Sequence, residues 1–374
     1  MLFNNKYTGI DVRDNKVTFA TIKLDKQAPV LEEVYEHSLQ ENIVANGVVV
    51  EKGLLSTAVR SYLKGNKKAS KKVHLSIPTQ NTLIRKITTL PDLEEKDLAK
   101  LIRFQIGESI HIPFEDPIYD FVKIGSVIPE RNGVRTDDDF TLEELANNVE
   151  KDIQGPRSEI LFFATSRSIS EDLMESCEEA GYKPLTAELR GLSLQRLLMY
   201  LHPSWLKDTA MILDVSEETV DIHIFKHDLI VFSRTMALEE PDERSPRQDE
   251  DVLAFSDEVA EETVTQVAAA REGSTKRLDE YVSSVITEIQ RAQNFFRYSL
   301  GERDSEFSKI IVTGESASLL IDPLSERMRM EISTIDYSSI VTAEQNQQLL
   351  DSCSVAIGLA LRANDKPDKN RKGK

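Results

Sequence analysis

Three short segments of the sequence hold residue types that could bind a phosphate or a metal ion. Each follows a run typical of a β-strand: residues 9–12 (Gly-Ile-Asp-Val), 213–215 (Leu-Asp-Val) and 312–315 (Val-Thr-Gly-Glu). Asp11 and Asp214 supply carboxylate oxygens, which Mg²⁺ prefers as ligands. Gly314 precedes a predicted helix, and the N-terminus of a helix attracts anions. This set indicates phosphate chemistry as one candidate function.

The same two aspartates have a second, structural interpretation, which we favour. A strand-end Asp can cap its own turn by accepting backbone N–H groups. The turns that follow, Arg-Asp-Asn-Lys at 13–16 and Ser-Glu-Glu-Thr at 216–219, contain no glycine, so side chains fill the space that a phosphate needs. The two glutamates would also repel a triphosphate. Arg13 or Lys16 could hold a phosphate, but we interpret both as solvated hairpin residues.

Other candidate sites are weaker. His223 and His227 are four residues apart, but the pattern places them on a strand and its turn, where they share no face, so we interpret them as surface histidines. Cys177 and Cys353 fall in predicted helices, and we interpret both as buried structural thiols. The sequence contains no P-loop and no Gly-x-Ser-x-Gly motif.

The elements that position the two aspartates form an internal repeat. In both halves an Asp ends a first strand, just before a hairpin turn. A β-β-β-α order predicts a fold other than the alternating βαβ of dinucleotide-binding proteins. The predicted strands are residues 7–12, 17–24 and 30–39 in the first half, before a helix at 54–63, and residues 210–215, 220–225 and 229–236 in the second.

The segments around this repeat differ in composition. An amphipathic helix that ends before Pro113 carries an apolar stripe of Leu98, Leu101, Ile102, Ile106 and Ile110. Residues 239–262 hold eleven acidic side chains and are predicted to be a solvated excursion. The remaining predictions are a polar insertion at 129–157 with a short helix at 142–149, a long helix at 278–296, a final helix at 344–361 and a basic tail at 366–374.

Composition excludes several classes of protein. The chain has 374 residues and a net charge of −18, which argues against a nucleic-acid partner because phosphates require basic surface. Two distant cysteines exclude a cysteine-based zinc site and suit the cytoplasm. No apolar run approaches the roughly 18 residues of a membrane span, and the N-terminus lacks the apolar core of a signal peptide, so we expect a cytoplasmic protein without direct membrane insertion.

An ordered set of motifs resembles the type IV pilus assembly protein PilM family, a branch of the actin-like ATPases. The strongest stretch is residues 77–121, which run from Ile-Pro through Ile-Thr-Thr-Leu-Pro-Asp-Leu-Glu-Glu-Lys-Asp-Leu to Ile-Pro-Phe at 112–114 and Asp-Phe at 120–121. Residues 356–362 look like the end helix of that family, and residues 312–314 like its adenosine-side turn.

The resemblance implies an actin-like α/β fold of two duplicated RNase-H-like lobes with an inserted α+β subdomain. The implied limits are 1–76 and 186–205 for the first lobe, 77–185 for the inserted subdomain, 206–238 and 305–363 for the second lobe, 239–304 for the acidic excursion and long helix, and 364–374 for a disordered tail. The family's glycine-rich turns are missing here, so the resemblance implies a vestigial nucleotide cleft at Asp11, Lys16, Asp214 and Gly314. We expect no cofactor, with ATP and Mg²⁺ as the alternative if the cleft still functions.

The resemblance also implies a partner. In PilM-like proteins the inserted subdomain helps to form a groove for the N-terminal cytoplasmic peptide of PilN, a single-pass membrane protein, and burial in an apolar groove orders such a peptide. We interpret part of the apolar set here as groove and part as internal core. The candidate groove residues are Leu83, Ile87, Leu98, Leu101, Ile102, Ile112, Pro113 and Phe114.

We therefore expect a non-catalytic scaffold of a pilus, pseudopilus or competence-type machine. It would lie at the inner face of the plasma membrane through a PilN-like partner, with other platform proteins or the assembly ATPase as further candidate partners. The sequence does not decide whether the chain associates with itself. The alternatives are an active ATPase or nucleotide switch and a cell-division tether like FtsA, against which the tail argues because it has no apolar face. A sugar kinase ranks last, because it too needs the phosphate turns.

Overall fold

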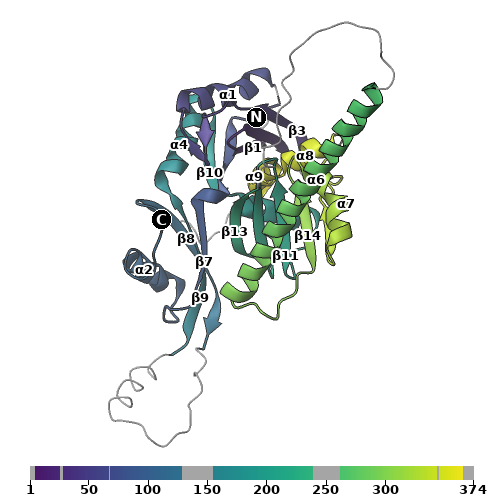
Figure 1. Ribbon diagram of the computed structural model, residues 1–374. Helices are drawn as coiled ribbons and strands as arrows, with labels where there is room; N and C mark the ends of the chain where they lie inside the picture. The colour runs from purple at the N-terminus through teal and green to yellow at the C-terminus, as the bar shows by residue number, and fades with distance from the viewer. Residues whose placement is uncertain are drawn as a thin grey trace, which may run out of the picture. The chain divides into compact units, whose positions relative to one another are not determined.

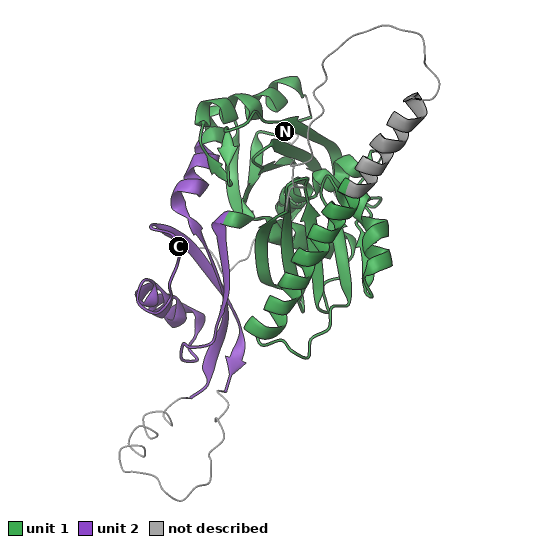
Figure 2. Ribbon diagram, viewed as in Figure 1, with its two compact units in different colours: residues 1–80, 176–374 green, residues 81–175 purple. Residues whose placement is uncertain are grey.

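The computed structural model describes residues 5–25, 28–66, 68–128, 155–238, 262–342 and 345–364 (Figure 1). The chain divides into two compact units, with residues 1–80 and 176–374 in unit 1 and residues 81–175 in unit 2 (Figure 2). The sequence placed the inserted subdomain at 77–185, wider than unit 2 at both ends. The predicted helix at 142–149 and tail at 366–374, and all but the last residue of the acidic segment, lie outside the described residues.

Unit 1 contains two five-stranded sheets of the same topology. Their strand orders are β10-β6-β1-β2-β3 and β13-β12-β11-β14-β15. In each sheet the first three strands are antiparallel, and the first strand also pairs in parallel with a later one. The predicted repeat is thus confirmed. The bounds are β1 (Lys6–Val12), β2 (Lys16–Leu24), β3 (Pro29–Ser38), β6 (Lys72–Ile77), β10 (Lys183–Leu189), β11 (Ala210–Val215), β12 (Thr219–Lys226), β13 (Leu229–Ala237), β14 (Lys309–Thr313) and β15 (Glu331–Thr334).

The helices of unit 1 cover these sheets. They are α1 (Lys52–Gly65), α5 (Arg190–Leu201), α6 (Glu262–Asn294), α7 (Ala317–Arg327), α8 (Gln347–Ser352) and α9 (Ser354–Leu361), with a small hairpin of β4 (Val44–Ala45) and β5 (Val48–Val49) and short turns η1 (Thr79–Asn81), η2 (Phe295–Ser299) and η3 (Arg362–Asn364). The apolar stripe predicted on the long helix is buried against the second sheet. The single final helix predicted at 344–361 is wrong, because the chain breaks at Cys353 into α8 and α9.

Helices α5 and α9 pack on each other between the two sheets, and glycines permit the close approach. Gly9 of β1 faces the backbone of Ala356 in α9, and Gly358 of α9 faces the backbone of Ser193 in α5. On the other side of α5, Gly191 lies against His223 of β12. The order from one sheet to the other is therefore β1, α9, α5, β12, and a Cβ atom at Gly9 or Gly358 would overlap backbone atoms.

We expect Gly358→Ala to lower the free energy of unfolding by about 1–3 kcal/mol, because α5 or α9 must shift to admit the methyl group. Gly53→Ala is the matched control, since a Cβ atom at this exposed position of α1 meets nothing within 4 Å. That control should be neutral or stabilising, because alanine has the higher helix propensity. Urea unfolding of the two variants checks this, and equal stabilities would contradict the close approach.

Unit 2 is a small α+β body. Its three-stranded sheet has the order β7-β9-β8, with β7 (Thr82–Ile87), β9 (Arg157–Ser166) and β8 (Pro117–Val127). Helix α2 (Glu95–Gln105) packs on one face of this sheet through Leu98 and Ile102, and α4 (Arg167–Glu179) spans the boundary to unit 1. Among the described residues, no helix combines the length and the apolar composition needed to cross a membrane.

Candidate functional site

The duplicated strands bring Asp11 and Asp214 to equivalent places. Asp11 is the second-last residue of β1 and pairs with Thr18 of β2. Asp214 is the second-last residue of β11 and pairs with Asp221 of β12. Both aspartates are buried, at 0% and 1% exposure. The site is therefore built from two copies of one strand-end position, as the sequence predicted.

Arg13 joins the two copies. Its Nε atom donates to Asp11 Oδ2 at 2.8 Å and its Nη2 atom to Asp214 Oδ2 at 2.5 Å. Its side chain is only 11% exposed. The interpretation of Arg13 as a solvated hairpin residue is therefore wrong. The interpretation that the two aspartates cap the backbone of their own turns is also wrong, because side chains, and not backbone N–H groups, donate to both carboxylates.

A second arginine completes the network from the first residue of α5. Arg190 donates from Nε to Asp11 Oδ1 at 2.8 Å, from Nη1 to Asp221 Oδ2 at 3.1 Å and from Nη2 to the carbonyl of Val12 at 2.7 Å. It is 4% exposed. Sequence analysis missed Arg190 and Asp221. The available signal was an arginine at the start of a helix with several leucines, because a buried arginine is almost always paired.

Hydroxyl groups and a buried histidine surround Asp221. Thr79 donates to Asp221 Oδ2 at 2.7 Å, and Thr235 donates to Oδ1. His223, two residues along β12, is buried and shares a hydrogen bond of 2.8 Å with Ser233. It is thus not the surface histidine that the sequence indicated, whereas His227 is exposed in a turn. No group of residues able to hold a metal ion occurs in the described part of the chain.

Lys16 forms a further link near the same turn. Its Nζ atom donates to Glu36 at 3.1 Å, to Ser352 at 2.9 Å and to Glu315. Lys16 is 4% exposed, so its interpretation as a solvated residue is also wrong. Glu315 follows Gly314, which lies against Asp214. The four residues predicted for the vestigial cleft, Asp11, Lys16, Asp214 and Gly314, therefore lie in one region, filled by ion pairs.

Burial and the arginines set the charge states of the three aspartates. Burial raises the pKa of Asp11, but Arg190, Arg13 and a hydrogen bond from Ser76 outweigh it, so this pKa lies well below its ordinary value. Burial also raises the pKa of Asp221, but the positive charge of Arg190 outweighs it, so the pKa of Asp221 is lowered. At Asp214 burial prevails over Arg13, and the pKa is raised. Burial lowers the pKa of His223 to about 4, so it is neutral at neutral pH.

The residues present do not fit a Mg²⁺–nucleotide. Both oxygens of Asp11 and Oδ2 of Asp214 are held by arginines. Asp214 Oδ1 has no hydrogen-bond partner among the described residues, but it packs against Gly314, where a Cβ atom would lie 2.8 Å away. The backbone N–H of Glu217, in the second turn, donates to Glu315 at 3.2 Å. Apart from Asp214 Oδ1, the carboxylate oxygens of these two aspartates and the backbone N–H of Glu217 are thus taken by the chain itself.

Sequence analysis attributed the poor fit to bulk and negative charge at the turns. In the structure Arg13, Arg190 and Lys16 form ion pairs with Asp11, Asp214, Asp221, Glu36 and Glu315. Glu217 and Glu218 of the second turn are exposed. The occupied hydrogen-bond partners therefore add to the two causes that the sequence indicated.

The candidate groove residues of unit 2 divide into two sets. Ile87, Leu98 and Ile102 are buried at 7%, 0% and 0% exposure within the unit's own core, so the assignment of these three to a groove is wrong. Leu83, Leu101, Ile112 and Phe114 are partly buried against that core, and Pro113 is exposed. Sequence analysis missed Phe104, which is 69% exposed on α2; its signal was an aromatic residue outside the apolar stripe.

Comparisons with known proteins bear on this fold. A family model described as type IV pilus assembly protein PilM matches residues 9–136 and 139–364. A solved PilM-PilN type IV pilus biogenesis complex is similar at a TM-score of 0.66 and 14% identity, over 96% of this chain and 99% of that chain. The predicted actin-like α/β fold is thus confirmed. No curated protein sequence matches significantly.

Two further structures match with lower scores. The ethanolamine utilization protein EutJ from Carboxydothermus hydrogenoformans has a TM-score of 0.45 and 10% identity, over 95% of this chain and 89% of that chain. The apo pSK41 ParM protein has a TM-score of 0.39 and 12% identity, over 97% of this chain and 100% of that chain.

Proposed function

This chain belongs to the type IV pilus assembly protein PilM family, and from that premise we propose that it is a nucleotide-independent scaffold that binds the N-terminal cytoplasmic peptide of a PilN-like membrane protein. The observation that carries the proposal is the family match across residues 9–136 and 139–364. The similar solved structure is a complex with PilN, which supports this class of partner. Such a partner would place the chain at the inner face of the membrane.

Unit 2 offers a surface that suits an apolar peptide. We name it the α2 patch and define it as Leu101, Phe104, Ile112, Pro113 and Phe114. Phe104 and Leu101 are three residues apart on α2, so they share a helix face. Leu101, Ile112 and Phe114 pack on the core with only part of their surface, which leaves apolar area for a ligand. Arg85 fixes the adjoining segment, because its Nη1 atom donates to the carbonyl of His111 at 3.0 Å.

We expect Phe104→Asp to weaken peptide binding about 10- to 100-fold, since an aromatic side chain contributes about 1.5–3 kcal/mol when buried. The measurement is calorimetric titration with a synthetic peptide that copies the first cytoplasmic residues of the PilN-like protein. Leu319→Asp is the matched control, because Leu319 is a similarly exposed apolar side chain, at 52%, on α7 of unit 1. Unchanged affinity in Phe104→Asp, with full affinity in the control, would exclude the α2 patch.

The proposal of nucleotide independence rests on the bridge from Asp11 through Arg13 to Asp214. The competing function is an ATP-dependent switch, and the unpartnered Asp214 Oδ1 is the observation that favours it. In that case Arg13 has to leave the cleft before Mg²⁺–ATP enters. The two functions differ in one measurable property, which is whether ATP stabilises the folded chain.

We expect Mg²⁺–ATP at millimolar concentration to leave the thermal midpoint of the chain unchanged. A ligand that binds only the folded state raises stability by RT ln(1 + [L]/Kd), so binding in the micromolar range would add about 4 kcal/mol at a thousandfold excess. Differential scanning fluorimetry across an ATP series checks this, with Mg²⁺–AMP as the control for ionic effects. A midpoint that rises with ATP, and that no longer does so in Asp11→Ala, would establish the switch.

A further inference from the structure

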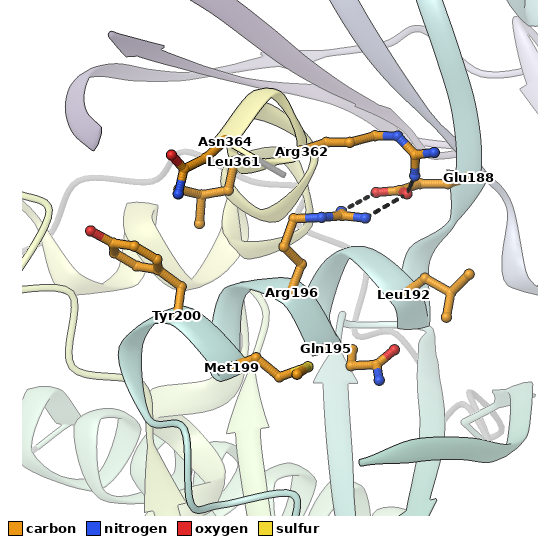
Figure 3. A pocket seen from close by; sticks show the side chains of 9 residues that line it. All are labelled: Glu188, Leu192, Gln195, Arg196, Met199, Tyr200, Leu361, Arg362 and Asn364. Atoms are coloured by element: carbon orange, nitrogen blue, oxygen red, sulfur yellow. Dashed lines mark hydrogen bonds and ion pairs between the residues drawn. The ribbon is translucent and has the colours of Figure 1, made fainter. Parts of the chain in front are cut away.

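A pocket on unit 1, remote in sequence from the α2 patch, is not used by the function proposed above. It has a volume of about 410 Å³ and lies between α5 and the chain segment that ends in η3. Figure 3 shows its side chains, which project from these two elements and, in the case of Glu188, from β10. The volume lies within the range of ligand sites, roughly 300–1,000 Å³.

One end of the pocket carries a surplus of positive charge. Arg196 donates to both carboxylate oxygens of Glu188, and the distance from Nη2 to Oε2 is 2.9 Å. It also donates to the backbone carbonyl of Gly358 at 3.2 Å. Arg362 donates to the same carboxylate (Figure 3). Two guanidinium groups thus share one carboxylate, in a chain whose net charge is −18.

Arg362 has donors left for a ligand. Within the described part of the chain its guanidinium group has one hydrogen-bond acceptor, Glu188, and its side chain is 33% exposed. An arginine offers five N–H donors, in a fork that matches a carboxylate. Glu188 and Arg196 hold this fork in place, so an incoming carboxylate meets a site that is already organised.

The other end of the pocket is apolar. Met199, 48% exposed, and Tyr200 line it (Figure 3). Leu192, Gln195, Arg196 and Met199 follow one another at helical spacing along α5, from residue 192 to residue 199. Seven residues of helix span about 10 Å, which equals about three residues of extended chain. The groove thus has the length of a short extended peptide segment.

We propose that this pocket is a second docking site, which takes an extended segment of a partner protein with an acidic side chain and an apolar side chain two residues apart. In an extended chain these two side chains point to the same face. The carboxylate pairs with Arg362 and the apolar side chain packs on Met199 and Tyr200. Met199 is half-exposed and Asn364 is exposed, so the pocket is open at its rim. An open rim suits an extended peptide segment better than an enclosed small molecule.

The test uses two fluorescein-labelled peptides, acetyl-Gly-Glu-Ser-Leu-Gly-amide and its Gln counterpart, and fluorescence anisotropy with the full chain. We expect the Glu peptide to bind about tenfold more tightly than the Gln peptide, and Arg362→Ala to remove that difference. Arg362→Ala should stay folded, because Arg196 still pairs with Glu188. Arg303→Ala, which removes the same charge from an exposed position of unit 1, should keep the difference.

Three results would overturn the proposal. Equal affinity of the Glu and Gln peptides, or no saturable binding of either, would exclude a carboxylate site. Tighter peptide binding after deletion of residues 239–261 would assign the pocket to the chain's own acidic segment. A dimer in sedimentation analysis that Arg362→Ala dissociates would assign it to a second copy. Because Phe104→Asp leaves this pocket intact, failure here and failure of the α2 patch are distinguishable.

Discussion

Arg190→Ala should lower the free energy of unfolding by about 3–5 kcal/mol, the cost of leaving buried charges without their partner. Arg190 is 4% exposed and forms ion pairs with Asp11 and Asp221, which are 0% and 3% exposed. Its loss leaves Asp221 with hydroxyl partners in place of a cation. Since domains are stable by only about 5–15 kcal/mol, this is a large fraction of the total.

The measurement is urea unfolding followed by the fluorescence of Trp205, the single tryptophan, which lies in unit 1. Arg303→Ala, at an exposed position, should leave the midpoint unchanged. Arg190→Lys keeps the charge but cannot form all three bonds, so we expect an intermediate loss. Adding Asp221→Asn to Arg190→Ala should recover part of the stability. A midpoint in Arg190→Ala equal to that of the wild type would refute the structural role of the network.

The network shows where sequence reasoning succeeds and where it fails. Asp11 and Asp214 could be predicted as site residues because each lies at the end of an apolar strand, just before a polar turn. This pattern depends only on residues that are close together in the sequence. Arg13 and Lys16 were misjudged because each has a partner far away along the chain: Asp214 lies 201 residues from Arg13, and Glu315 lies 299 residues from Lys16. A lysine or arginine in a hairpin turn has the same local sequence whether it is solvated or paired across a cleft. Whether such a side chain is solvated or paired depends on how the two lobes pack together.

The apolar stripe of α2 has a similar ambiguity. Spacing at 98, 101 and 102 predicts that one helix face is buried, but it does not say whether the cover is the unit's own sheet or a ligand. The structure assigns Leu98 and Ile102 to the core against Phe121 and Phe162 of the sheet. The helix face that keeps free area is marked instead by Leu101 and Phe104.

This assignment predicts opposite outcomes for two neighbouring substitutions. Ile102→Asp should destabilise unit 2 by more than about 4 kcal/mol, because Ile102 is fully buried and a carboxylate there has no partner. Phe104→Asp should leave stability within about 0.5 kcal/mol of the wild type, as expected for a surface position. Both variants should bind the PilN-like peptide weakly, the first because unit 2 unfolds and the second because the α2 patch is lost.

Hydrogen exchange measured by mass spectrometry separates these causes in the full chain. In Ile102→Asp we expect amides of β7, α2, β8 and β9 to lose protection, while the fluorescence of Trp205 still reports a folded unit 1. In Phe104→Asp the same amides should stay protected. Leu54→Asp, at an exposed position of α1, controls for the added charge. If Ile102→Asp kept full protection and lost only peptide binding, Ile102 would line the groove after all, and the core seen in unit 2 would have to open when the peptide binds.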